Sequence, residues 1–155
     1  MTKTRIAHRD NLFDYFQSGI ERAQAAQGTS LDQDTLLYLV HLLADRARAD
    51  RPTLAETTLA ELHGRAANAP PSQQASTYRE LGDRSLYQLG YFAESLDRRI
   101  VGPSYYQSMG AAAYWRVDQV FKRWFADAFG PVFHELALEF EQCVALIREV
   151  RHTAD

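Results

Sequence analysis

The sequence has little of what marks secreted, membrane-spanning or disulfide-bonded proteins. Its single cysteine, Cys143, cannot form an intrachain disulfide, which favours a reducing compartment. The longest apolar run, over residues 36–44, is interrupted by His41 and is far shorter than the roughly 20 residues of a membrane-spanning helix. The first thirty residues contain no continuous apolar segment of the kind that signal peptides carry. We therefore expect a soluble cytoplasmic protein without a membrane partner.

The chain also has no excess of charge of one sign. The formal net charge is -3, and acidic and basic residues are spread along the whole sequence. Nucleic-acid-binding domains usually carry a basic stripe or cluster, so a nucleic-acid partner is not expected. Basic groups such as Arg46 and Arg48 fall near the predicted end of a helix, where the helix dipole favours cations.

Sequence signatures of catalysis and cofactor binding are missing as well. The chain contains no HExxH, CxxC, P-loop, GxGxxG or GxSxG motif. His41 and Asp45 have the spacing of ligands on one helix face, and residues 149–152 match Glu-x-x-His once, where a di-iron site needs two such pairs. Cys143 lies on an apolar helix face, as a buried structural cysteine does. We expect no catalytic residue, no metal and no cofactor.

What the chain does have is helical periodicity. Apolar residues recur at three- and four-residue intervals and no segment alternates with a period of two, which predicts an all-α fold. We expect a single domain over residues 10–152, a bundle of about six helices, preceded by a short tail over residues 1–9. The expected helices cover residues 11–27, 30–50, 53–64, 72–82, 84–98, 104–129 and 131–150, with residues 82 and 83 either a break or a kink. Ser30, Thr53 and Ser104 each open a predicted capping box, with Gln or Glu three residues later.

The segment over residues 84–98 is apolar on nearly every side, which predicts the central helix of the bundle. Asp83 would make a good N-cap for it. Gly90 and Gly110 lie inside predicted helices, where each glycine costs about 1 kcal/mol relative to alanine. That cost indicates the close approach of a neighbouring helix, with a flat ligand or a hinge as alternatives.

Tyrosines are concentrated in the same part of the chain. Because a buried tyrosine hydroxyl needs a hydrogen-bond partner, a dry core would favour phenylalanine or leucine instead. Three interpretations stay open: a core with bonded hydroxyls, an interface with another protein, or a ligand cleft between helices. The candidate site consists of these tyrosines and the charged residues near them: Tyr87, Tyr91, Tyr105, Tyr106, Tyr114, Arg79, Asp83 and Arg84.

Several of these residues belong to a longer pattern. It comprises Tyr38-Leu-Val-x-Leu-Leu, Glu80-Leu-Gly-Asp83-x-x-Leu-Tyr, Gly90-Tyr-Phe and Tyr105-Tyr-x-x-Met-Gly-x-x-Ala-Tyr114. The pattern resembles a group of bacterial all-helical proteins for which no activity is established, and the resemblance would cover most of residues 10–150. It implies a bacterial cytoplasmic origin and no mechanism.

Three functions follow as hypotheses. The first is a non-catalytic interaction or regulatory protein that binds a protein partner or self-associates through a Tyr-rich face. The second is a binder of a small flat or apolar ligand in a cleft lined by Tyr87, Tyr91 and Tyr105. The third is an enzyme, which would need a carboxylate or histidine with a shifted pKa at the base of a cleft, with Asp83 and His134 as the first candidates.

Overall fold

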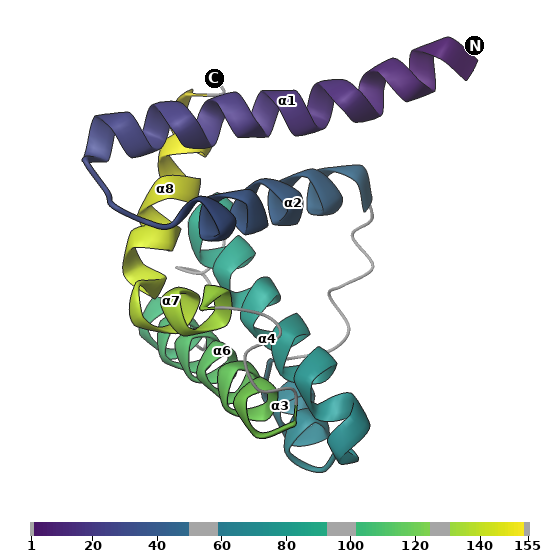
Figure 1. The fold of residues 1–155 in the computed structure, drawn as a ribbon, viewed down its shortest axis with the longest axis vertical. Coiled ribbons are helices and arrows are strands. Elements are labelled where there is room, and N and C mark those ends of the chain that lie inside the picture. The colour runs from purple at the N-terminus through teal and green to yellow at the C-terminus, as the bar shows by residue number, and fades with distance from the viewer. Residues whose placement is uncertain (1, 50–58, 93–101, 125–130, 154–155) are drawn as a thin grey trace.

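The computed structural model describes residues 2–49, 59–92, 102–124 and 131–153. These residues form α-helices and contain no strand, so the predicted all-α class is confirmed (Figure 1). The helices are α1 (Thr2–Gln27), α2 (Gln33–Ala49), α3 (Leu59–Ala67), α4 (Pro71–Tyr91), α6 (Pro103–Trp124), α7 (Val132–Leu138) and α8 (Phe140–Thr153).

Helix α4 lies at the centre of the described part of the chain. It contacts α2, α3, α6 and α8, while α1 packs on α2 and α8 (Figure 1). From Leu81 to Gly90 this helix buries most of its side chains, because neighbours cover it on several faces. The prediction of a central helix over residues 84–98 thus holds up to the end of α4, and residues 93–98 lie outside the described part.

The helix passes through Gly82 and Asp83 without a break. Of the two predicted alternatives, a break or a kink, the break is wrong, and Asp83 is a buried residue in the helix interior instead of an N-cap. A Cβ atom at position 82 would lie only 2.7 Å from the Tyr114 ring on α6. Glycine is present here because another helix places a ring against the backbone, not because the chain turns.

Several predicted boundaries differ from the structure. Helix α1 begins at Thr2 and not at Asn11, since no helix-breaking residue precedes Asn11, and the predicted tail is therefore helical. Helix α2 begins at Gln33, and Leu36 donates its N–H to the carbonyl of Asp32, so the predicted capping box at Ser30 is wrong. Gly28, with φ of 64°, ends α1 as a left-handed residue. The predicted box at Thr53 lies outside the described residues. The predicted box at Ser104 is wrong, because α6 begins at Pro103 and the carbonyl of Gly102 accepts from Tyr106 N.

A further difference is at the C-terminal end. The single helix predicted over residues 131–150 is two helices, α7 and α8, in the structure. Glu139 separates α7 from α8 with φ of -108° and ψ of 31°, and α7 lies across the end of α8 (Figure 1). The bend brings Phe133 of α7 and Phe140 of α8 against the same Tyr114 ring, at centroid distances of 6.1 and 6.0 Å. Helical periodicity continues across such a bend, so the sequence pattern does not reveal it.

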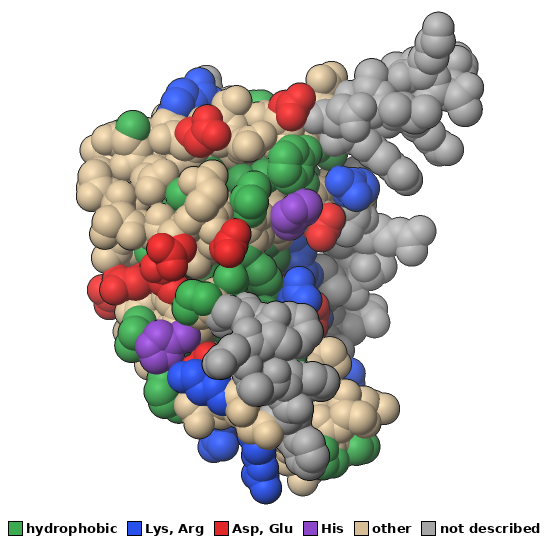
Figure 2. Space-filling model, viewed as in Figure 1, with side chains coloured by type: hydrophobic (Ala, Val, Ile, Leu, Met, Phe, Trp, Pro, Cys, Tyr) green, Lys and Arg blue, Asp and Glu red, His purple; other side chains and the backbone are tan. Residues whose placement is uncertain are grey.

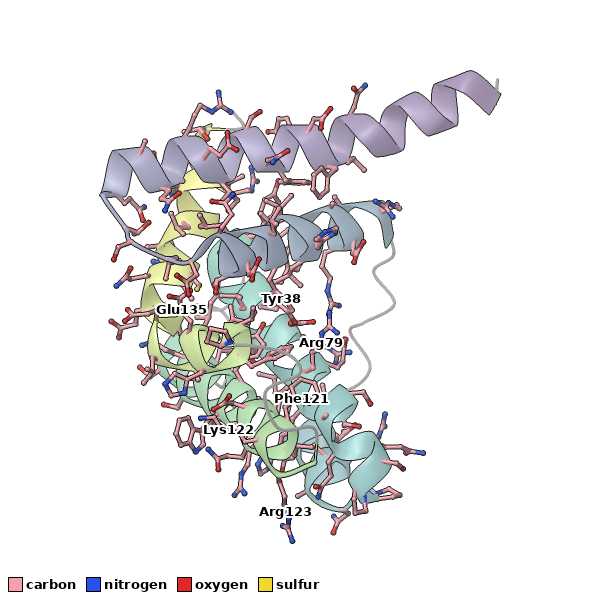
Figure 3. All side chains as sticks on the ribbon, in the orientation of Figure 1. Tyr38, Arg79, Phe121, Lys122, Arg123 and Glu135 are labelled. Atoms are coloured by element: carbon pink, nitrogen blue, oxygen red, sulfur yellow. The ribbon has the colours of Figure 1, made fainter. Side chains whose placement is uncertain are left out.

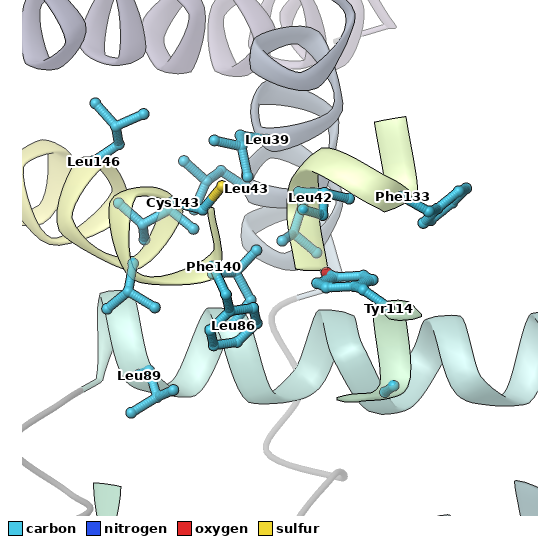
Figure 4. Close-up of a cluster of buried hydrophobic side chains, with 14 of the residues drawn as sticks. Leu39, Leu42, Leu43, Leu86, Leu89, Tyr114, Phe133, Phe140, Cys143 and Leu146 are labelled. Atoms are coloured by element: carbon cyan, nitrogen blue, oxygen red, sulfur yellow. The ribbon is translucent and has the colours of Figure 1, made fainter. Parts of the chain in front are cut away.

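The core lies where α2, α4, α6, α7 and α8 meet, around leucines and the Tyr114 ring (Figure 4). Two glycines allow the closest helix approaches. A Cβ atom at Gly90 would lie 2.5 Å from Ile147 of α8, and one at Gly110 would lie 2.5 Å from Phe140 and 2.8 Å from Ser85. The prediction of a neighbouring helix close to both glycines is confirmed: Gly90 faces α8, and Gly110 faces both α8 and α4.

Candidate functional site

A buried carboxylate, Asp83 on α4, is the centre of a polar network within the apolar core. Its Oδ1 accepts hydrogen bonds from Tyr38 Oη of α2 at 2.5 Å and from Tyr114 Oη of α6 at 2.7 Å. Arg79, one turn earlier on α4, places its Nε 3.8 Å from Asp83 Oδ2 and donates from the same Nε to Tyr38 Oη at 3.0 Å. Three helices that are distant in sequence therefore converge on one carboxyl group.

The physical chemistry of these groups fixes the direction of the hydrogen bonds. Burial, together with the nearby carboxylate of Asp83, raises the pKa of Tyr38 and of Tyr114 well above the usual value. Both phenols therefore keep their protons and donate them. Burial also raises the pKa of Asp83, although the two phenol hydrogen bonds and the positive charges of Arg79 and Arg46 oppose that shift.

A depression of about 310 Å³ opens beside this network, between α2 and α4. Figure 3 shows Tyr38 and Arg79 side by side in this space. The side chains that line it are mostly polar or charged: Tyr38, His41, Leu42, Asp45, Arg46, Arg79, Glu80 and Asp83. Asp83 is at the base of the depression, since it is buried while Arg79, His41 and Asp45 are exposed at its rim.

A second ion-pair system forms the other wall. Arg46 donates from one Nη atom to both carboxylate oxygens of Glu80, at 3.0 and 3.1 Å. Arg84, one turn further along α4, lies 3.6 Å from the same carboxylate. This trio links α2 to α4 next to the Asp83 network and leaves Glu80 surrounded by two guanidinium groups.

The structure brings together only part of the predicted site. Arg79, Asp83 and Tyr114 are in one network, and Arg84 adjoins it through Glu80. The tyrosines at the ends of the two helices are not hydrogen-bond partners of Asp83 within the described chain. Of the three interpretations of the tyrosines, a core tyrosine with a bonded hydroxyl describes Tyr114, which is fully buried.

Tyr87 and Tyr91 lie at the C-terminal end of α4, where their rings stack on each other at 5.4 Å with an interplanar angle of 12°. Burial raises the pKa of Tyr87 to about 12. Tyr105 and Tyr106, at the start of α6, pack edge to face at 6.3 Å. The depression described above is lined by none of these four rings, so the predicted cleft between Tyr87, Tyr91 and Tyr105 is not where this depression lies.

Sequence reasoning missed three members of the observed network. Tyr38, Arg46 and Glu80 were not among the candidate residues, although Tyr38 belongs to the pattern that carries the resemblance. A tyrosine inside the apolar stripe of a helix needs a partner for its hydroxyl, and that was the available signal. The partner itself, 45 residues away, could not be read from spacing.

His134, named above as a candidate of the enzyme hypothesis, lies in a different cluster. Its Nδ1 is 3.2 Å from Oδ2 of Asp118, a buried carboxylate of α6 that Lys122 also contacts at 3.0 Å. The exposed Trp115 ring lies 5.8 Å from the His134 ring. The arrangement is a solvent-facing ion pair with a histidine, and no described nucleophilic side chain is bonded to it.

Two other side chains of reactive types, Cys143 and His41, have structural surroundings. Cys143 is buried, and burial, with the charges of Glu135 and Glu139, raises the pKa of its thiol to about 12, as expected of a structural cysteine. His41 packs on the Phe13 ring at 5.1 Å. Within the described residues, no three histidine, cysteine or acidic side chains come together as a metal site would require. No described helix is both long and apolar enough to cross a bilayer.

Comparison with known proteins adds no assignment. No protein-family model, no curated protein and no solved structure matches the chain. The resemblance to bacterial helical proteins therefore stays a prediction, and the function has to be argued from the described residues.

Proposed function

We propose that this chain is a non-catalytic interaction protein of the bacterial cytoplasm that self-associates through an aromatic face. The aromatic face consists of Tyr15 on α1 and of Tyr87, Tyr91 and Phe92 at the end of α4. The observation that carries the proposal is the exposure of two large rings there: Tyr15 is 43% exposed and Phe92 is 42% exposed.

The rings of this face form a continuous group. Phe92 packs against Tyr87 at 5.3 Å and against Tyr91 at 5.4 Å. Phe16, which is buried, lies 5.1 Å from Tyr15 and 6.5 Å from Tyr91 and so joins α1 to the end of α4. The guanidinium of Arg151 on α8 lies over the Tyr91 ring at 5.4 Å.

Such a surface has the composition of an interface centre. Tyrosine, phenylalanine and arginine are enriched at protein interfaces. The rigid aromatic rings among them bury a large area at a small entropic cost. Stacking holds Tyr87 and Tyr91 in place before any partner arrives, which lowers the entropy lost on association. A second copy of the chain is the simplest partner, since a two-fold contact would place each aromatic face on its equivalent.

The experiment is sedimentation velocity over a range of concentrations, with wild type and Phe92→Ser compared. We expect wild type to self-associate and Phe92→Ser to shift towards monomer. Leu138→Ser on α7 is the matched control: Leu138 is 65% exposed, more than Phe92, yet it is not part of the aromatic face. A wild-type chain that stays monomeric, or a Leu138→Ser effect equal to that of Phe92→Ser, would refute self-association through this face.

A further inference from the structure

The two oxygens of Asp83 have different surroundings. Oδ1 accepts two hydrogen bonds from phenols, while the nearest donor to Oδ2 is Arg79 Nε at 3.8 Å, which is longer than a hydrogen bond. No described protein group donates a hydrogen bond to Oδ2. Asp83 lines the depression between α2 and α4, and its Oδ2 is not one of the sealed, unpaired side-chain atoms of the described chain, so this oxygen can be reached from the depression. The depression thus offers a strong acceptor to a ligand.

Arg79, one turn before Asp83 on α4, offers donors to the same depression. Its guanidinium lies over the Tyr38 ring at 5.2 Å and over the Phe133 ring at 5.9 Å, and its Nε is bonded to Tyr38 Oη. These contacts fix the plane of the guanidinium, while its two terminal amino groups donate to no described residue. The side chain is 54% exposed. A planar guanidinium held in this way is suited to two parallel hydrogen bonds with a carboxylate.

The other charges around the depression compensate one another. Arg46 is bonded to both oxygens of Glu80, and Asp45 lies 3.7 Å from Arg48. Arg79 and Asp83 pair with each other at 3.8 Å without a hydrogen bond between them, so both keep hydrogen-bonding capacity for a ligand. Figure 2 likewise shows acidic and basic side chains close together on this face, with neither sign covering it.

This pairing determines the charge that a ligand must carry. A ligand with one charge that binds beside this pair would be attracted by one partner and repelled by the other. A ligand with both charges can place each charge on the partner of opposite sign. We propose that the depression binds a small zwitterion of the amino-acid type, with its ammonium group on Asp83 Oδ2 and its carboxylate on the terminal amino groups of Arg79.

The size and the lining agree with this assignment. A volume of about 310 Å³ is at the lower end of the range for small-molecule sites, which suits an amino acid and not a nucleotide. The Tyr38 ring and Leu42 provide the apolar contact for a side chain. The site is separate from the aromatic face, so it stands or falls independently of self-association.

The first test uses the full-length wild-type chain. The twenty proteinogenic amino acids are screened by thermal shift, and the best one is compared by calorimetry with its primary amide, which lacks the carboxylate, and with its N-acetyl form, which lacks the ammonium. We expect the zwitterion to bind at least about tenfold more tightly than either derivative, because each derivative loses a charge-assisted hydrogen bond. Binding of no amino acid at about 10 mM, or an amide that binds as tightly as the free amino acid, would overturn the proposal.

The second test removes one protein charge. Arg79→Gln should weaken the zwitterion by at least about tenfold and should not weaken the amide to the same extent, because the amide has no carboxylate to pair with the guanidinium charge. Arg79 is half-exposed, so its replacement should leave a folded chain, which circular dichroism checks. Arg116→Gln, an exposed arginine of α6 outside the depression, is the matched control and should bind as wild type. Unchanged zwitterion affinity in Arg79→Gln would refute the site.

Discussion

Replacement of Gly82 by alanine tests whether the Tyr114 ring determines the packing of α4 against α6. A Cβ atom at position 82 would lie 2.7, 2.8 and 2.9 Å from three atoms of that ring. The ring has little room to move, since Tyr114 is fully buried, its centroid is 6.0 Å from that of Phe140, and its hydroxyl is bonded to Asp83 at 2.7 Å.

Two opposing effects set the magnitude for Gly82→Ala. Alanine favours the helix over glycine by about 1 kcal/mol. Overpacking of a core costs about 1–3 kcal/mol, and a Tyr114 hydroxyl displaced from Asp83 would cost roughly 1.5–3 kcal/mol more, because that hydrogen bond is made to a carboxyl group. The clash outweighs the gain in propensity, so we expect the free energy of unfolding to fall by about 2–4 kcal/mol.

Gly64→Ala is the matched control, because it makes the same chemical change inside helix α3. Nothing lies within 4 Å of a Cβ atom at position 64, so only the helix propensity changes, and we expect stabilisation of up to about 1 kcal/mol. Urea unfolding followed by far-ultraviolet circular dichroism measures both variants. If Gly82→Ala were as stable as wild type, or if the two variants changed stability in the same direction, the role assigned to the Tyr114 ring would be wrong.

Two further predictions concern titratable groups in the core. Burial raises the pKa of Asp83 above the usual 3.8, so the folded state holds this proton to higher pH than the unfolded state does. The free energy of unfolding of wild type, relative to that of Asp83→Asn, should therefore decrease as pH rises through and above 4. Urea titrations of both proteins across the acid range check this, and a relative stability that increases with pH would contradict it. Cys143 is buried and its thiol has a pKa raised to about 12, so it should react rapidly with a thiol reagent in urea. In native buffer it should react only as fast as the chain unfolds, and rapid labelling there would show that the thiol is accessible.

The helices and the fold class could be predicted because their signals are local. Apolar residues at helical spacing identify most of the helices, since three- and four-residue intervals place side chains on one face whatever lies opposite. The burial of Cys143 and the cost of glycine inside helices could be read in the same way. Helix ends were less reliable: the start of α2 depends on Gly28 and on Asp32, while a capping pattern at Ser30 was equally plausible in the sequence.

The candidate site depended on information that is not local. The sequence could name Arg79, Asp83 and Tyr114 as polar residues in an apolar region, but it could not connect them to Tyr38, which precedes Asp83 by 45 positions. Nor could it decide whether Gly82 and Asp83 end a helix, because a glycine that accommodates a ring from another helix looks the same in sequence as one that ends its own.

The sequence alone therefore determined an all-α chain and, in residues 84–91, the C-terminal part of its central helix. Only the tertiary structure decided which tyrosines are core, which are exposed, and which hydroxyls reach Asp83. The physical reason is that hydrogen bonds between helices depend on the rotation and register of each helix against its neighbour. Those are set by packing at close contacts such as Gly82 with Tyr114, Gly90 with Ile147 and Gly110 with Phe140, and no spacing within one helix encodes them.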